Sequence, residues 1–154
     1  MRDIKPQLSG AGQRIAIVRS RFNEPIGAAL LDSCLARLTE LGVAGEHITV
    51  ISVPGALEVP LALQKLAGTR KYEAMIALGA VIRGDTLHFE IVSYESASGI
   101  AQVQLDSGIP VANGILTTDT GAQAEARVVQ KGRDCAEAVV EMVNLARSIA
   151  KLHQ

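Results

Sequence analysis

An apolar stretch in the middle of the chain, followed at once by polar residues, constrains the fold more than any other feature. Residues 75–82 are apolar and are interrupted only by Gly79. A run of this kind is typical of a strand buried on both faces of a parallel sheet. Open α/β sheets bind their ligands at the carboxyl ends of such strands. We therefore expect a functional site at residues 79–88, where the polar residues are Arg83, Asp85, Thr86 and His88.

The glycines of this stretch have a spacing that is also found in phosphate-binding loops. Gly79 and Gly84 are separated like the two glycines of a nucleoside triphosphate loop, but Asp85 stands where that loop carries its lysine. The cation that would contact the outer phosphates is thus replaced by a carboxylate, and we expect no such loop. A tight strand exit that lets a backbone approach closely accounts for the glycines as well.

Strand and helix patterns alternate along the chain. Apolar runs predict strands at residues 14–20, 48–53, 75–82 and 109–116. Helical periodicity predicts helices at residues 26–41, 60–66, 87–105 and 134–152, and a capping-box pair, Thr120 and Gln123, starts a further helix. Residues 89–94 alone could form a strand on local propensity, and length favours the helix.

This alternation predicts an α/β fold. We expect one domain at residues 14–154, a three-layer αβα sandwich around a four-stranded parallel sheet with flavodoxin-like winding, after an N-terminal arm at residues 1–13. In a parallel sheet all strand exits lie at one edge. The segments expected to meet there are residues 22–23, 55–58, 79–88 and 113–118.

Charge and hydropathy argue against several classes of partner. The 154 residues carry a net charge of −1 and no cluster of Lys and Arg, so we expect no nucleic-acid partner. No apolar run reaches the roughly 20 residues of a membrane span. Residues 1–13 contain no apolar signal-peptide core, and we expect the cytoplasm. Cys34 and Cys135 lack metal-site or redox spacing and are predicted to lie in the core.

A series of short motifs resembles the signature blocks of a known family. They occur in order between residues 14 and 127, at residues 20–23 (Ser-Arg-Phe-Asn), 53–58 (Val-Pro-Gly-Ala-Leu-Glu), 77–86, 88–90, 116–118 and 123–127. In sequence and spacing these blocks resemble the lumazine synthases. The resemblance implies an enzyme that condenses 5-amino-6-(D-ribitylamino)uracil with 3,4-dihydroxy-2-butanone 4-phosphate. Phosphate and water are released, and the product is 6,7-dimethyl-8-ribityllumazine, in the penultimate step of riboflavin biosynthesis.

The resemblance also implies a role for each matching position. Phe22 matches the aromatic residue that stacks on the pyrimidine ring, and His88 matches the proposed proton-transfer residue. Other contacts to the pyrimidine and its ribityl chain are implied for Asn23, Ala56, Leu57, Glu58, Ala80, Val81, Ile82 and Asn113. Phosphate contacts are implied for Asp85, Thr86 and Arg127. No metal and no organic cofactor is implied.

These residue types suit the implied chemistry. An amine attacks a ketone, water and phosphate leave, and a second amine closes the ring, so protons move repeatedly near neutral pH. Histidine is the side chain that ordinarily titrates in that range. The phosphate dianion needs the forked, permanently charged donor that Arg127 offers. Asp85 would repel the phosphate, so we expect its backbone amide to face that group. Holding two substrates in the right orientation can lower the activation free energy by on the order of 7 to 11 kcal/mol.

Several positions depart from the family pattern. Many members have an aromatic residue where this chain has Leu57 and Asn113, which alters the pocket wall. The lysine that follows the arginine in the family has no secure counterpart, and Lys131 and Arg133 are the candidates. Arg83 resembles a site residue, but we interpret it as a partner in structural ion pairs.

The resemblance further implies an assembly. Family members form pentamers in which neighbours share each active site, with Arg127 supplied by the adjacent subunit, and some form sixty-subunit shells. The arm could add an edge strand to a neighbour's sheet. A non-catalytic flavin- or lumazine-binding protein, an inactive shell protein and a riboflavin synthase acting on two lumazines are the alternatives. The presence of both His88 and Arg127 favours the synthase.

Overall fold

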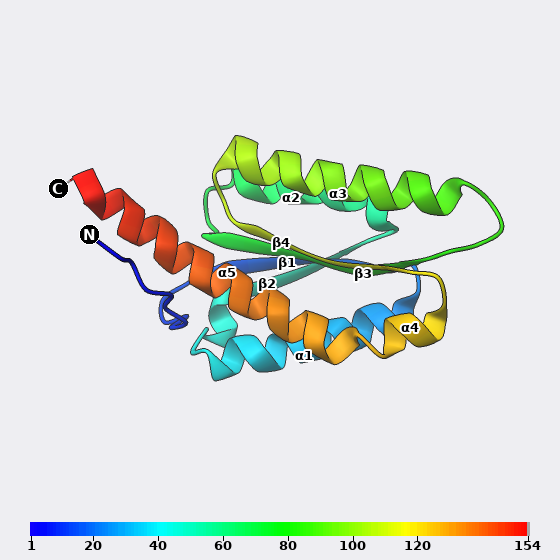
Figure 1. The fold of residues 1–154 in the computed structure, drawn as a ribbon, viewed down its shortest axis with the longest axis horizontal. Coiled ribbons are helices and arrows are strands. Elements are labelled where there is room, and N and C mark those ends of the chain that lie inside the picture. The colour runs from blue at the N-terminus through cyan, green and yellow to red at the C-terminus, as the bar shows by residue number, and fades with distance from the viewer. Residues whose placement is uncertain (154) are drawn as a thin grey trace.

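The computed structural model describes residues 1–153, and in that part of the chain four parallel strands lie between two layers of helices (Figure 1). The sheet order is β2-β1-β3-β4. The strands are β1 (Ile15–Ser20), β2 (Ile48–Val53), β3 (Ala74–Ile82) and β4 (Val111–Thr118). One face is covered by α1 (Glu24–Glu40), α4 (Gly121–Glu125) and α5 (Val128–Ala150). The other is covered by α2 (Val59–Gly68) and α3 (His88–Ser107). The predicted α/β class and four-stranded parallel sheet are confirmed.

Single 3₁₀ turns complete the elements. They are η1 (Gly45–His47), η2 (Ala56–Glu58) and η3 (Lys151–His153). The turn at η2 joins the exit of β2 to α2 and carries residues of the predicted site. None of the helices within residues 1–153 is long and apolar enough to cross a membrane.

The two central strands carry apolar side chains on both faces, as predicted for a buried parallel sheet. Ile17 of β1 lies opposite Ile76 of β3 and packs on the α1 and α5 side. The neighbouring positions, Ala16 and Met75, pack on the α2 and α3 side. Because successive side chains of a strand point to opposite faces, one apolar run supplies both halves of the core. Burial on both faces therefore fixes the register of these strands.

Helices α1 and α5 approach each other closely, and this explains a boundary that the sequence prediction placed wrongly. The last helix was predicted to begin at residue 134, but α5 begins at Val128. Gly132 lies inside α5, where an added Cβ would come within 2.7 Å of Ser33 and 2.9 Å of the Cys34 amide nitrogen. The glycine is therefore required by helix packing and does not end the helix.

Both cysteines lie in this core, as predicted. Cys34 and Cys135 are buried and form no disulfide. Burial raises the pKa of Cys34 to about 12 and that of Cys135 to about 11. The two side chains are therefore neutral thiols that pack as small hydrophobic groups.

The fourth strand lies two residues later than predicted at each end. Gly108, with a φ of 72°, ends α3, and the chain then turns before it pairs with β3 at Val111. The amide of Val111 donates to Oε1 of Gln104 at 2.8 Å, which fixes the start of the strand. As a consequence, Asn113 is the third residue of this edge strand, opposite Ala77, and does not lie at the strand exit.

The N-terminal arm has no helix or strand of its own and lies against α5 (Figure 1). Asn144 of α5 donates through Nδ2 to the carbonyl oxygens of Gln7 and Ser9, at 2.8 and 3.0 Å. The buried Gln13 donates through Nε2 to the carbonyl of Val140 and to Oδ1 of Asn144. These bonds attach the arm to its own subunit up to Gln7. Its predicted addition to a neighbour's sheet stays a prediction.

Candidate active site

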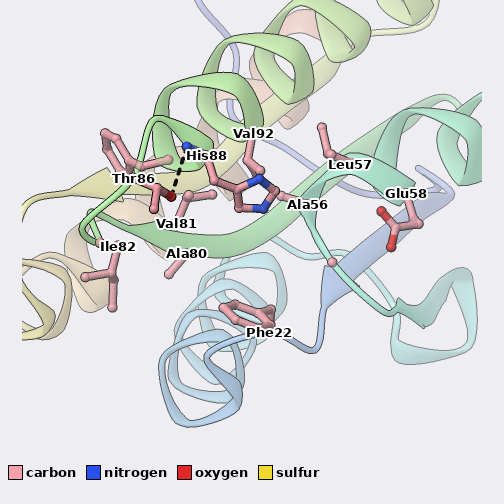
Figure 2. Close-up of a pocket in the computed structure, with 13 residues that line it drawn as sticks. Phe22, Ala56, Leu57, Glu58, Ala80, Val81, Ile82, Thr86, His88 and Val92 are labelled. Carbon is pink, nitrogen blue, oxygen red and sulfur yellow. Dashed lines mark hydrogen bonds between the residues drawn. The ribbon is translucent and has the colours of Figure 1, made fainter.

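A pocket of about 310 Å³ opens at the carboxyl edge of the sheet (Figure 2). We call it the His88 pocket. Its walls come from the exits of β1, β2 and β3 and from the first turns of α3. Most of the predicted site residues line it, namely Phe22, Ala56, Leu57, Glu58, Ala80, Val81, Ile82, Thr86 and His88. The lining is completed by Gly55, Gly84, Phe89 and Val92. The expected convergence is confirmed for these three strand exits, whereas residues 113–118 of β4 do not line this pocket.

The exit of β1 presents Phe22 through an unusual backbone turn. Asn23 adopts a left-handed conformation, with φ 59° and ψ 52°, which asparagine tolerates better than most residues. Its side chain Nδ2 donates to the carbonyl oxygen of Ala80 at 2.9 Å, so the exits of β1 and β3 are joined. The chain reverses into α1 immediately afterwards, with Pro25 in the first helical turn. This geometry leaves Phe22 70% exposed at the rim of the pocket.

The exit of β2 brings a carboxylate to the same pocket. Glu58 ends η2 and is the N-cap residue of α2, and Pro60 occupies the first turn of that helix as predicted. The carboxylate lies over Gly55, where an added Cβ would be 3.6 Å from Oε1. A carboxylate at this helix start is favoured by the helix dipole. Its oxygens can accept hydrogen bonds from a ligand in the pocket.

The loop from β3 to α3 carries Thr86 and His88. In Figure 2 the imidazole of His88 points into the space bounded by Phe22, Ala56 and Glu58. The backbone amide of His88 lies 3.4 Å from Oγ1 of Thr86, which is a long hydrogen bond. The first amides of a helix of 20 residues, together with this hydroxyl, form an arrangement that suits an anion. Asp85 is exposed in the same loop and does not line the pocket.

A second cavity of about 500 Å³ lies between α3 and the exit of β4, and we call it the Arg127 pocket. It contains Asn113 and Arg127, which are therefore not brought into the His88 pocket. Nη1 of Arg127 donates to the carbonyl oxygen of Gln123 at 2.9 Å, and within residues 1–153 its guanidinium makes no ion pair. The predicted capping box of Thr120 and Gln123 is confirmed and starts α4 beside this pocket.

Some positions that line the pockets were missed by the sequence reasoning. Phe89 lines both pockets, and Val92 lines the His88 pocket. The sequence did contain an indication of this, because both positions were predicted to lie on one face of the helix that follows the loop. Arg83 was predicted to form ion pairs, which is confirmed by its contacts with Asp119 and Glu90. The hydrogen bond that Arg83 donates to Asp119 raises the pKa of Arg83 above its already high value.

The candidates for the missing family lysine do not reach either cavity. Arg133 pairs with Glu40 of α1 at 3.4 Å, and neither Arg133 nor Lys131 lines the His88 pocket or the Arg127 pocket. In the described part of the chain there is also no group of three or more His, Cys, Asp or Glu side chains that could hold a metal ion.

Comparison with known proteins assigns the family. The family model described as 6,7-dimethyl-8-ribityllumazine synthase matches residues 12–147. The chain belongs to this family. Proteins named 6,7-dimethyl-8-ribityllumazine synthase are 61% identical in Ralstonia pickettii and 60% identical in Ralstonia nicotianae, each over 142 residues and 92% of this chain. These alignments cover 86% and 87% of the two relatives. A third in Paraburkholderia phymatum is 57% identical over 148 residues, covering 96% of this chain and 86% of the relative. The family match includes both pockets.

Proposed function

We propose that this protein is a lumazine synthase. It condenses 5-amino-6-(D-ribitylamino)uracil with 3,4-dihydroxy-2-butanone 4-phosphate and releases 6,7-dimethyl-8-ribityllumazine, phosphate and water. The observation that carries the proposal is the meeting of Phe22, Glu58 and His88 in one pocket, although each comes from a different strand exit. The match of the family model over residues 12–147 supports the same activity.

The His88 pocket is proposed to bind the pyrimidine substrate. Phe22 offers an exposed aromatic face at the rim, on which a flat ring can stack. Glu58 accepts hydrogen bonds from the ribityl hydroxyls. The backbone at Val81 and Ile82 provides polar groups at the edge of the ring, while their side chains with Ala56, Leu57, Ala80 and Val92 give an apolar wall. A mostly apolar pocket with a few oriented polar groups is typical of small-molecule sites.

His88 is proposed to transfer protons between the two substrates. The amine of the pyrimidine adds to the ketone carbon, and loss of water from the carbinolamine gives an imine. Removal of a proton beside the imine allows the phosphate to leave, and the ribityl-bearing nitrogen then closes the ring with loss of a second water. A histidine at the mouth of the pocket can accept and return protons in these steps. The imidazole of His88 has this position.

The phosphate of the second substrate is proposed to lie beside the loop from β3 to α3. Thr86 offers a hydroxyl, and the first turn of α3 offers backbone amides and the positive end of a helix dipole. Asp85 contributes its backbone amide while its carboxylate faces solvent. Arg127 supplies the permanent charge with forked donors that this dianion requires.

The separation of the two pockets supports a site that is shared between subunits. Arg127 and Asn113 line a different cavity from His88, so one subunit does not surround both substrates with all its predicted residues. In a head-to-tail ring, the Arg127 pocket of one copy faces the His88 pocket of the next. We propose a pentamer of this kind, and a sixty-subunit shell as the larger assembly. We expect it in the cytoplasm.

The direct test is to mix the purified protein with both substrates and to follow lumazine fluorescence and phosphate release together. We expect the two products to appear in a ratio of one to one, with neither product when either substrate is omitted. Binding of the pyrimidine without phosphate release would refute the synthase and favour a non-catalytic binding protein. Sedimentation of the same sample tests the assembly separately, because a mass near that of a monomer or dimer excludes the pentamer and the shell.

A further inference from the structure

Arg83 contacts several elements beside the proposed site. It follows β3 directly, and its backbone amide donates to the carbonyl oxygen of Thr118 at the end of β4. Its Nε donates to Oδ1 of Asp119 at 2.8 Å, and its Nη1 lies 3.4 Å from Oε1 of Glu90. The guanidinium carbon lies 4.4 Å from the centre of the Phe89 ring, as in a cation–π contact. The side chain therefore joins the exit of β3 to the turn after β4 and to the first turn of α3, and the backbone amide pairs with the end of β4.

These contacts close the loop that carries Thr86 and His88. The loop runs from Gly84 to the start of α3. Arg83 lies just before the loop, and its partners on α3, Phe89 and Glu90, lie just after it. All residues from Gly84 to His88 are exposed. Within residues 1–153 the only side-chain hydrogen bond in this segment is the long one from the His88 amide to Thr86. The loop has little internal support, so its position depends on what holds its two ends together.

A short series of hydrogen bonds leads from Arg83 towards Arg127. Arg83 binds the carboxylate of Asp119, whose backbone amide donates to Oε1 of Gln123 at 2.8 Å. The carbonyl oxygen of Gln123 accepts from Nη1 of Arg127 at 2.9 Å. Arg83 and Arg127 also line the same cavity. The residue that holds the loop of the His88 pocket is thus connected to the arginine of the other pocket.

We infer that Arg83 is a positioning residue for the proposed reaction. Its guanidinium fixes the β3–α3 loop so that Thr86 and His88 keep their places at the His88 pocket. Through Asp119 and Gln123 it also supports the segment that leads to Arg127. Arginine is suited to this role because its planar fork can contact two carboxylates and an aromatic face at once, which lysine cannot do. The inference rests on the proposed function for its effect on catalysis. Its effect on the loop can be measured independently.

The test compares Arg83→Gln and Arg83→Lys with Arg37→Gln as a matched control. Arg37 also contacts two carboxylates, Glu40 and Glu137, but it joins α1 to α5 away from both pockets. We expect Arg83→Gln to lower kcat about tenfold and to raise KM for the butanone phosphate, because small displacements of reacting groups are costly. Arg83→Lys should remain impaired, since it restores the charge without the fork. The control should keep kcat and both KM values.

Two further measurements separate positioning from general stabilisation. Exposed ion pairs contribute little to global stability, so we expect the Tm of Arg83→Gln to stay close to that of the unsubstituted protein. Hydrogen exchange of the backbone at residues 84–88 should be faster in Arg83→Gln but not in Arg37→Gln. Unchanged exchange, or a lower Tm with unchanged kcat and KM, would overturn the inference. An unsubstituted protein that releases no phosphate would instead refute the proposed function, while the exchange still reports on the loop.

Discussion

The two cavities at the carboxyl edge differ in the chemistry that they contain. The His88 pocket is the smaller, at about 310 Å³, and most of its wall is apolar. The Arg127 pocket is about 500 Å³ and contains charges of both signs, including those of Arg83, Glu90 and Asp119. We propose that the first binds the flat ring of the pyrimidine, and that Arg127 of the second contacts the phosphate held at the β3–α3 loop of the neighbouring subunit. Neither pocket of a single subunit contains all the predicted site residues. The proposed reaction therefore needs residues of both pockets.

The origin of this division lies in the path of the chain after β3. Helix α3 begins after the exit of β3 and runs to the start of β4, and residues of its first turns line both cavities. Phe89 lines both of them from this position. One crossover helix therefore separates the residues of β1, β2 and β3 from those of β4 and α4. The variants below test whether the two cavities have separate roles.

The largest effect is expected for His88→Ala. Removal of a general acid–base group costs about 10²- to 10⁴-fold in rate, so kcat should fall by at least about 100-fold. Binding of the pyrimidine should change little, because the stacking and ribityl contacts remain. Steady-state kinetics with a separate binding titration measure both quantities. His47→Gln, on η1, is the matched control and should keep the full rate. An unchanged kcat for His88→Ala would remove this residue from the mechanism.

The next effect is expected for Arg127→Ala. A charge-assisted hydrogen bond contributes about 1.5 to 3 kcal/mol, so KM for the butanone phosphate should rise about 10- to 150-fold. KM for the pyrimidine should stay nearly constant if the two pockets have separate roles. Arg147→Ala removes an arginine from α5, the helix that Arg127 precedes as its N-cap, and should leave both values unchanged. An equal rise in both KM values would contradict the division between the pockets.

The sequence predicted those features of the molecule that depend on residues close together in the chain. The apolar run that became β3 and the capping box of α4 follow from short-range chemistry, and both were predicted correctly. The start of α5 was not, because Gly132 is required by contact with α1 and not by its own helix. Likewise, the role of Arg83 depends on Asp119, which lies 36 positions later in the chain. The short stretches from which helices, strands and turns are predicted do not contain both residues.

The shared site predicts that two inactive variants restore each other. If the His88 pocket of one subunit meets the Arg127 pocket of its neighbour, His88→Ala and Arg127→Ala subunits that are unfolded together and reassembled should form some complete sites. Random mixing in equal amounts gives both intact groups at about one quarter of the sites in a head-to-tail ring. Activity should therefore recover to about that fraction of the unsubstituted value. Separately reassembled variants are the control, and a mixture no better than their average would place both pockets within one subunit's own site.

The smallest effect is expected for Phe22, which offers only stacking. Aromatic pairs contribute about 0.5 to 1.5 kcal/mol beyond the burial of area, so Phe22→Leu should raise KM for the pyrimidine about 2- to 13-fold. Phe22→Tyr keeps the ring and should remain close to the unsubstituted protein. KM for the butanone phosphate should not change in either variant. If Phe22→Leu altered both KM values alike, the β1 exit would be shaping the whole carboxyl edge, and the distinction between a ring pocket and a phosphate pocket would not hold.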